Sequence, residues 1–224
     1  MNWFYLTKKP YKTLIILRIM FLVLLTIFFL FTAIYFLFFS SGNLVDWQLK
    51  LYLKLGILKI ENHREDAIQP NSLDVHLGDH YAIQLNDGSF EEIITDEFIL
   101  KPGDFVLATT QEYFYFGSTT HGVLQGKSSW ARVGLYVESA GLFDSGFEGV
   151  AVIELTNQGK APLRLINGQP IAQMIFQKNL PVLKSYKCKG HYNGQRNAKQ
   201  TWMKNVVEKT RQKIVVDFEK ANSI

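Results

Sequence analysis

The sequence predicts a mainly β domain, built as a sandwich or a barrel, with an apolar helix before it and an amphipathic helix after it. Short runs of β-branched and aromatic residues follow one another from Ile68 to Gln177, separated by Gly, Asn, Asp and Pro. This spacing is typical of all-β domains rather than of alternating strands and helices. An uninterrupted apolar run precedes this region, and a helical pattern of apolar and charged residues follows it.

The segment 14–40 is predicted to cross a membrane as a single helix, behind a basic tail of residues 1–13. It carries no charged residue from Ile19 to Phe39, and about 20 apolar residues are enough to span the core of a bilayer. A buried core helix is disfavoured because the run is apolar on every face. The run is longer than the apolar part of a typical signal peptide, but the small residues in "FSSG" leave a cleaved signal as the alternative.

The folded domain is expected to occupy residues 44–202. It opens with a helix in "DWQLKLYLKLGILKI", where Trp47, Leu51 and Leu55 recur at helical spacing and Gly56 ends the helix. The expected strands follow in seven runs: "SLDVHLG", "YAIQL", "DFVLATT", "EYFYFG", "VAVIELTN", "PLRLI" and "IAQMIFQ". Residues 203–224 are predicted to form an amphipathic helix that packs on the domain or on a partner subunit, with these apolar positions on one stripe: Met203, Val206, Val207, Ile214 and Phe218.

The charge distribution argues against a surface that binds nucleic acid. The net charge of the chain is +4. The part of the chain before Asn43 has four basic residues and no acidic residue, so it accounts for the whole net charge. The rest of the chain is therefore balanced, whereas binding along a nucleic acid needs clustered Lys and Arg. Cys188 is the only cysteine, which excludes an intramolecular disulfide and a metal site made of several cysteines.

Polar residues gather in an otherwise strand-like stretch between positions 124 and 159. Lys127, Ser128 and Ser129 offer a cation, two hydroxyls and backbone N–H groups for phosphate oxygens, although such a run is common in loops. Arg132 is suited to a carboxylate or to a developing negative charge. Asp144 opens "DSGFEG", whose glycines predict a tight turn.

Glu154 is the candidate general base. In "VAVIELTN" the residues Val152 and Glu154 share one strand face, while Ile153 and Leu155 make the opposite face apolar. A carboxylate on a mostly apolar strand is either held in an ion pair or, where burial disfavours its charge, poised to accept a proton near neutral pH. These residues by themselves leave both alternatives open.

Four blocks in a fixed order carry a family likeness: "IQPNSLDVHLGD" (68–79), "GKSSWARVGLYVESAGLFDSGFEG" (126–149), "VIELTNQGKAPLRLINGQPIAQMIF" (152–176) and "HYNGQ" (191–195). Together they resemble the dCTP deaminase branch of the trimeric dUTPase-like family, over about residues 45–202. The resemblance implies a distorted β-barrel that assembles as a homotrimer, with active sites between subunits. It also implies deamination of dCTP to dUTP and ammonia without zinc, with Mg²⁺ bound through the triphosphate and no metal held by protein side chains.

The same resemblance implies the site residues, position by position. Glu154 corresponds to the general base that activates water for attack at C4 of cytosine, and Ser128 and Arg132 correspond to residues that orient this water and support the reacting centre. Asp144 corresponds to the residue at the sugar. The implied nucleotide-binding set is completed by residues of the same blocks and of a C-terminal segment that closes over the triphosphate: Lys127, Ser129, Trp130, Ala131, Ala140, Val152, Ile153, Tyr186, His191 and Gln195.

The sequence departs from the family pattern in three places. Lys127 stands where the family usually has Arg, which keeps the charge but loses the bidentate fork. His191 stands where the closing segment usually has Lys, so its contact with phosphate is expected to be weaker and to depend on pH. Ala140 and Gly141 stand in a block where many monofunctional deaminases carry a histidine. This third departure resembles relatives that also hydrolyse dUTP, in which the aspartate at the position of Asp144 helps to position the water.

The sequence therefore predicts a single-pass, membrane-anchored dCTP deaminase that supplies dUTP for dUMP and dTTP synthesis. Two alternatives stay open, a bifunctional enzyme that continues to dUMP and a non-catalytic membrane-tethered module that binds deoxynucleotides. The presence of Ser128, Arg132 and Glu154 together favours an enzyme. Four basic residues before the span and three after it weakly favour a cytoplasmic N-terminus. Because nucleoside triphosphates are cytosolic, we instead expect the domain to face the cytoplasm.

Overall fold

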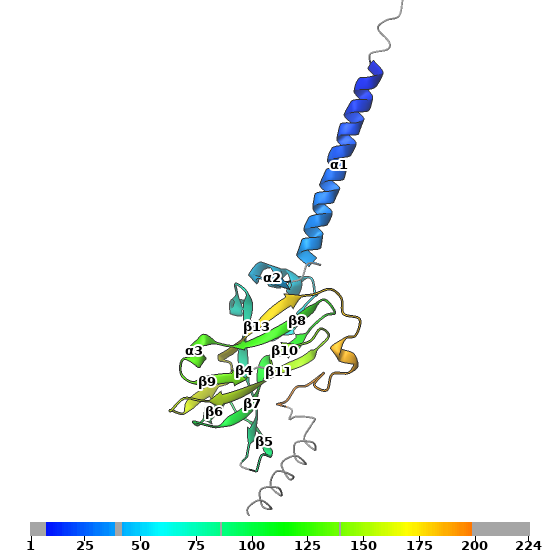
Figure 1. Cartoon of the computed structure of the whole chain (residues 1–224). Helices are drawn as coiled ribbons and strands as arrows, with labels where there is room; N and C mark the ends of the chain where they lie inside the picture. Colours follow the sequence, from blue (N-terminus) through cyan, green and yellow to red (C-terminus); the bar gives the residue numbers. More distant parts are fainter. Residues whose placement is uncertain (1–7, 39–41, 86, 139, 199–224) are drawn as a thin grey trace, which may run out of the picture. The chain divides into compact units, whose positions relative to one another are not determined.

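The computed structural model describes residues 8–38, 42–85, 87–138 and 140–198, and the chain forms two compact units, residues 1–41 and residues 42–224. The described part of the first unit is one helix, α1 (Lys8–Phe38), drawn in blue in Figure 1. The helix begins at Lys8, so the second half of the expected basic tail belongs to it. The predicted helix at 203–224 lies outside the described residues.

Helix α1 is long and apolar enough to cross a membrane. The 26 residues from Tyr11 to Phe36 have a mean hydropathy of 2.9, and none of this stretch is buried within the structure. At 1.5 Å per residue such a helix measures about 39 Å, which exceeds the roughly 30 Å of a bilayer core.

The second unit is mainly β, as predicted, and is built on one curled antiparallel sheet with the order β10-β8-β13-β4-β7-β11-β9 (Figure 1). The long strands are β4 (Ser72–Gln84), β7 (Phe105–Tyr115), β11 (Glu148–Asn157) and β13 (Pro170–Lys178). The shorter strands are β1 (Gly42–Asn43), β2 (Lys59–Glu61), β3 (Ile68–Gln69), β5 (Phe90–Ile94), β8 (Thr120–Gly126), β9 (Leu135–Glu138) and β10 (Leu142–Phe143). Strands β6 (Glu97–Leu100) and β12 (Leu163–Ile166) pair separately. Register shifts in β4, β11 and β13 bend the sheet, as β-bulges do.

Two pairs of expected strands are single strands in the structure. The runs "SLDVHLG" and "YAIQL" form β4, because Gly78, the last residue of the first run, lies against β7, where a Cβ would come 2.6 Å from the Thr109 hydroxyl. The runs "DFVLATT" and "EYFYFG" make up β7, and Glu112, the polar residue that opens the second run, is fully buried and bonded to His76. The Nδ1 atom of His76 lies 2.6 Å from Oε1 of Glu112. A strand interior therefore accepts a glycine or a carboxylate where a neighbouring strand supplies the contact.

Helix α2 (Asp46–Lys54) follows β1 and covers the sheet with one face. Leu49 and Tyr52 are buried on that face, whereas Trp47 and Leu55, from the predicted apolar stripe, are 55% and 53% exposed. Gly56 follows the helix with φ +68° and stops it, as predicted. The remaining helical turns are short: η1 (Glu65–Ala67), α3 (Ser128–Ala131) and η2 (Tyr186–Cys188).

Aromatic side chains form a continuous part of the core and lead from the sheet to η2. The ring of Phe116 lies 5.9 Å from that of Phe176 and 6.5 Å from that of Phe147. Phe147 in turn lies 5.1 Å from Phe143 and 5.8 Å from Tyr186. This chain of rings ties η2, which follows the last strand of the sheet, to the interior.

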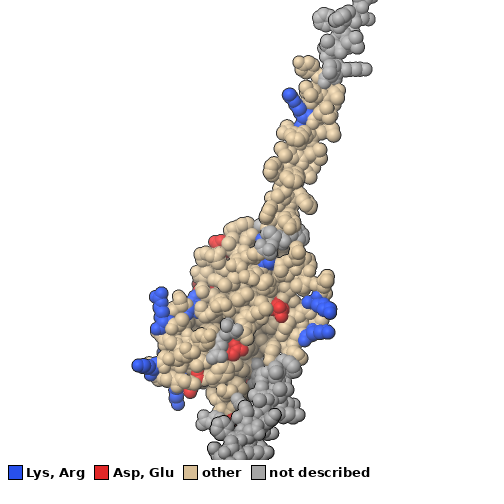
Figure 2. Space-filling model, viewed as in Figure 1, with Lys and Arg blue, Asp and Glu red and all other residues tan. Residues whose placement is uncertain are grey.

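Charged side chains are dispersed over the domain face shown in Figure 2. Lys and Arg lie mainly at the left and right edges of this face, with acidic side chains between them. The dispersion on this face accords with the balanced charge of the chain after Asn43.

Candidate active site

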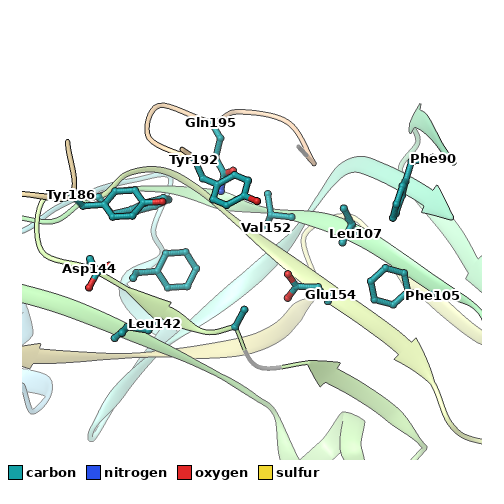
Figure 3. Close-up of a pocket in the computed structure, with 13 residues that line it drawn as sticks. Phe90, Phe105, Leu107, Leu142, Asp144, Val152, Glu154, Tyr186, Tyr192 and Gln195 are labelled. Carbon is teal, nitrogen blue, oxygen red and sulfur yellow. The ribbon is translucent and has the colours of Figure 1, made fainter. Parts of the chain in front are cut away.

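A pocket of about 410 Å³ opens between β7, β11 and the C-terminal segment 186–195 (Figure 3). Most of its wall is apolar: Phe90, Phe105, Leu107, Ala140, Leu142, Phe143, Phe147 and Val152. Polar groups come from Asp144, Glu154, Tyr186, Tyr192 and Gln195. A mostly apolar pocket with a few converging polar groups is typical of a small-molecule site.

Glu154 reaches the pocket because β11 alternates as predicted. Ile153 and Leu155 are 1% and 0% exposed on the core side of the strand, and Val152 and Glu154 lie on the pocket side. Across the sheet Glu154 stands opposite Leu107 of β7 and position 138 of β9. Figure 3 shows its carboxylate directed into the middle of the pocket, between Phe105 and Asp144. A carboxylate in these surroundings has the placement that a proton-transfer group needs.

Asp144 opens a tight turn, as its sequence predicts. Its carbonyl oxygen accepts a hydrogen bond from Phe147 N at 3.0 Å, and Gly146 within the turn has φ +89°. A Cβ on Gly146 would overlap the Ser185 hydroxyl. The N–H of Tyr186 donates to the carbonyl of Ser145 at 3.0 Å. The turn therefore holds the start of η2, and with it the Tyr186 ring, at the pocket.

The segment that contains Gln195 is bound along the first residues of β11. Gln195 forms a parallel bridge with Gly149: Val150 N donates to Gln195 O, and Gln195 Nε2 donates to Val150 O, each at 3.0 Å. Among the described residues the buried Gln195 Oε1 has no hydrogen-bond partner. Since a buried acceptor without a partner is costly, this oxygen is available to an N–H or O–H donor of a ligand in the pocket.

The chain beyond Gln195, up to Ala198, is held against the sheet by three contacts. The Arg196 guanidinium lies 4.5 Å from the centre of the Tyr113 ring. Burial, assisted by Glu148, raises the pKa of Tyr113, whose hydroxyl donates to Glu148 at 3.3 Å. Ala198 is fully buried against Ala82 and Leu107, and its N–H donates to His80 Nδ1 at 3.2 Å. These contacts fasten the C-terminal segment to its own domain.

The predicted phosphate cradle lies elsewhere on this chain. Residues 127–132 comprise α3 and the residue on each side of it, and none of them lines the pocket of Glu154. Ser128, Ser129, Ala131 and Arg132 are exposed, and the indole N–H of Trp130 donates to Pro170 O at 2.9 Å. Lys127 Nζ lies 2.6 Å from Asp74 Oδ1, with both side chains mostly buried. One copy of the chain therefore carries the predicted site residues as two separate groups.

Two further predicted residues lie outside the pocket. The side chain of Ile153 belongs to the core, so only its main chain is left to face a ligand. His191 lines a second cavity of about 770 Å³, which shares Leu142, Asp144 and Tyr186 with the pocket of Glu154. The residues that the structure brings together from the predicted set are Ala140, Asp144, Val152, Glu154, Tyr186 and Gln195.

Several lining residues were not predicted. Tyr192 belongs to the block "HYNGQ", so the sequence contained a signal for it. Phe90 and Phe105 stand at the starts of two ordinary strands, and no motif marks them. They reach the pocket because β5 and β7 lie beside the C-terminal segment. There Phe90 and Phe105 pack against the cluster that contains Ala198.

The family model described as dCTP deaminase-like matches residues 43–179. The chain belongs to this family. The match covers the first three of the four sequence blocks, confirms the family resemblance and places the chain among enzymes. A relative named "dCTP deaminase, dUMP-forming" from Methanosphaerula palustris is 34% identical over 171 residues, which cover 69% of this chain and 92% of the relative.

Other relatives and a solved structure agree with the family assignment. A "dCTP deaminase, dUMP-forming" of a Sulfurihydrogenibium species is 35% identical, covering 67% of this chain and 91% of the relative. A "dCTP deaminase" of Ignicoccus hospitalis is 32% identical, covering 68% and 93%. The crystal structure of 2'-deoxycytidine 5'-triphosphate deaminase from Agrobacterium tumefaciens superposes with a TM-score of 0.54 at 18% identity, over 62% of this chain and 49% of that one. The superposition confirms the fold.

Proposed function

We propose that this chain converts dCTP and two molecules of water to dUMP, ammonia and diphosphate. The observation that carries the proposal is the Glu154 carboxylate, held in a mainly apolar pocket that also contains Asp144. The names of the relatives from M. palustris and Sulfurihydrogenibium support this dUMP-forming alternative better than the expected release of dUTP.

In the proposed deamination Glu154 takes a proton from water as the water oxygen bonds to C4 of cytosine. Glu154 then returns this proton to the exocyclic nitrogen, the C4–N bond breaks, and ammonia leaves. The second proton of the water ends on ring N3 of the uracil. One carboxylate suffices for both transfers, and the apolar residues Phe105, Leu107 and Val152 keep bulk water from the reacting centre.

The proposed second step is hydrolysis between the α- and β-phosphates. A water oxygen bonds to the α-phosphorus and releases a proton to solvent, the bond to the bridging oxygen breaks, and diphosphate leaves. We assign Asp144 to the positioning of this water, because it lies in the pocket of Glu154 and on the wall of the adjoining cavity.

Charge at the triphosphate is the remaining requirement. No Lys or Arg is among the described residues that line the pocket of Glu154, yet a triphosphate needs cations and N–H donors. We propose that a second copy of the chain supplies Ser128, Ser129 and Arg132, which are exposed around α3, and that the active form is a homotrimer. Mg²⁺ is proposed to enter with the nucleotide, since it usually binds through substrate phosphates. It neutralises part of the triphosphate charge.

The chain is proposed to act at a membrane surface, with α1 as a single-pass anchor and the domain in the cytoplasm. The hydropathy of α1 supports the anchor, and the location of nucleoside triphosphates supports the orientation. Protease protection on sealed inside-out vesicles tests the orientation. Cleavage of the domain without detergent is expected, and protection would contradict the orientation.

The activity is tested with the full-length chain in detergent, supplied with dCTP and Mg²⁺. Ammonia is measured enzymatically, and dUTP, dUMP and diphosphate are separated by ³¹P NMR. Glu154→Gln is expected to lower ammonia release by about 10²–10⁴-fold, the usual contribution of a general base. The matched control is Glu91→Gln, an exposed strand glutamate of β5 outside the pocket.

The products separate the alternatives. Ammonia with dUTP as the end product would assign a dCTP deaminase without the second activity. Binding of dCTP without turnover would assign a deoxynucleotide-binding module. Unchanged ammonia release by Glu154→Gln would show that another group takes the proton.

A further inference from the structure

Helix α2 turns an unusual face to solvent. Its buried face holds Leu49 and Tyr52, each 1% exposed, and packs on the domain. The opposite face carries Trp47 and Leu55, which are more than half exposed, together with the exposed Lys50 and Lys54. The outward face of a helix on a soluble domain is normally polar. The exposed Trp and Leu side chains of α2 therefore stand out, because they do not contribute to the packing of the domain.

More exposed apolar residues lie at the same end of the domain, which we call the β1 end. Gly42 of β1 pairs with position 178 at the end of β13. The chain that leaves β13 is held by Asn179 N and Val182 N, which donate to carbonyls of the turn after β7. That turn in turn lies against the connection from α2, where a Cβ on Gly117 would be 3.3 Å from Ile57 O. In this loop Leu180 is 66% exposed and Leu183 is completely exposed.

The covalent chain keeps the β1 end near the end of α1. Three residues, 39–41, separate Phe38 of α1 from Gly42 of β1. Consecutive Cα atoms are about 3.8 Å apart, so Gly42 lies within about 15 Å of Phe38 at any angle between the two units. Where α1 spans a membrane, as proposed above, the β1 end is therefore within reach of the membrane surface.

We propose that the exposed face of α2, with Leu180 and Leu183, docks into the interfacial layer of an anionic membrane. Trp is favoured at the membrane–water interface because its ring is both apolar and able to donate a hydrogen bond. Lys50 and Lys54 match the negative headgroups of the leaflet. Lys is depleted in the cores of protein–protein interfaces, whereas Lys beside Trp and Leu on one short helix is typical of membrane-surface helices.

The test places a nitroxide at position 55 of the full-length chain, through Leu55→Cys in a Cys188→Ser background, in vesicles of phosphatidylglycerol and phosphatidylcholine. Cys188 is the only native cysteine and is exposed. Accessibility to a water-soluble nickel chelate and to oxygen is measured by EPR. Val23→Cys reports on α1, and Ile94→Cys is the matched control, since Ile94 is 73% exposed on β5.

In anionic vesicles the label at position 55 is expected to be shielded from the nickel chelate and open to oxygen, while the label at position 94 stays open to the chelate. Lys50→Gln with Lys54→Gln is expected to lower the ratio of docked to undocked domain by about 25-fold, since each basic residue at an anionic surface contributes about fivefold.

Three results would overturn the proposal. If the label at position 55 is as open to nickel as the one at position 94 while position 23 is embedded, the docking fails and the anchor stands. Exposure of position 23 to nickel overturns the anchor and the docking together. Spin–spin broadening at position 55 would show that a second copy of the chain covers this face instead.

Discussion

Replacing Gly146 with alanine tests whether the Asp144 turn holds Tyr186 in the pocket. A Cβ at this position would overlap Oγ of Ser185 and lie 3.0 Å from its Cβ. Ser185 therefore has to move, and we expect the bond that the next residue makes, from Tyr186 N to Ser145 O, to be lost with it. Since Tyr186 lines the pocket, activity is expected to fall together with stability.

The size of the effect follows from two terms. An L-residue in the left-handed region costs about 1–2 kcal/mol, which applies because Gly146 has φ +89°. Loss of one backbone hydrogen bond adds about 1 kcal/mol, for a total of about 2–3 kcal/mol. At about 2–4 °C per kcal/mol for a chain of this size, Tm falls by about 4–12 °C. The bond from Tyr186 N to Ser145 O holds η2 at the pocket. If the roughly 1 kcal/mol lost with this bond is also lost from transition-state stabilisation, kcat/KM for dCTP falls about fivefold.

Gly103→Ala is the matched control, because Gly103 has φ +85° and a Cβ there would meet nothing within 4 Å. It is expected to lower Tm by about 2–8 °C through the backbone term alone, with kcat/KM unchanged. Combining Gly146→Ala with Ser185→Gly removes the overlapping atoms and should restore activity towards that of the control. Equal losses of Tm and of kcat/KM in Gly146→Ala and Gly103→Ala would refute the reasoning.

Three other substitutions test separate contacts. Gln195→Leu removes the bond to Val150 O, so the KM for dCTP is expected to rise while Tm changes by less than about 4 °C. An unchanged KM would show that Gln195 does not contribute to binding dCTP. Asp74→Asn weakens the contact with Lys127, whose side chain is 18% exposed. The free energy of unfolding, measured with denaturant, should fall by about 1.5–3 kcal/mol. A fall below about 0.5 kcal/mol would contradict this prediction. Burial raises the pKa of Glu112 above its ordinary 4.5, so the folded chain keeps a proton that the unfolded chain releases as pH rises past that value. The Tm of the native chain should therefore fall relative to that of Glu112→Gln between about pH 4 and the raised pKa, and a constant difference would show that the carboxyl titrates alike in both states.

The strand pattern shows how far local sequence carries. Alternation in β11 predicted correctly that Ile153 and Leu155 face the core and that Glu154 lies on the other face. The breaks expected within β4 and β7 were wrong, because Gly78 and Glu112 are accommodated by contacts with other strands. A residue that reads as an interruption in one strand is acceptable where its neighbour in the sheet supplies the missing contact.

Helix α2 shows a second limit of periodicity. Trp47, Leu51 and Leu55 predicted a helix, and the helix is present. The burial of Leu49 and Tyr52 instead of Trp47 and Leu55 did not follow from the pattern, because apolar residues occur on both faces. The sheet beneath α2 selects the buried face.

The sequence by itself determined the properties that depend on neighbours along the chain. These are the apolar length of α1, the alternation around Glu154, the turn at Asp144 and, through the four blocks, the family. Only the tertiary structure decided which of the predicted residues share a pocket. Glu154, Asp144 and Gln195 meet because the C-terminal segment pairs with β11, whereas the residues around α3 remain apart in one chain. The physical reason is that side-chain facing is set over two to four residues, while a site is assembled by contacts between segments that are far apart in the sequence.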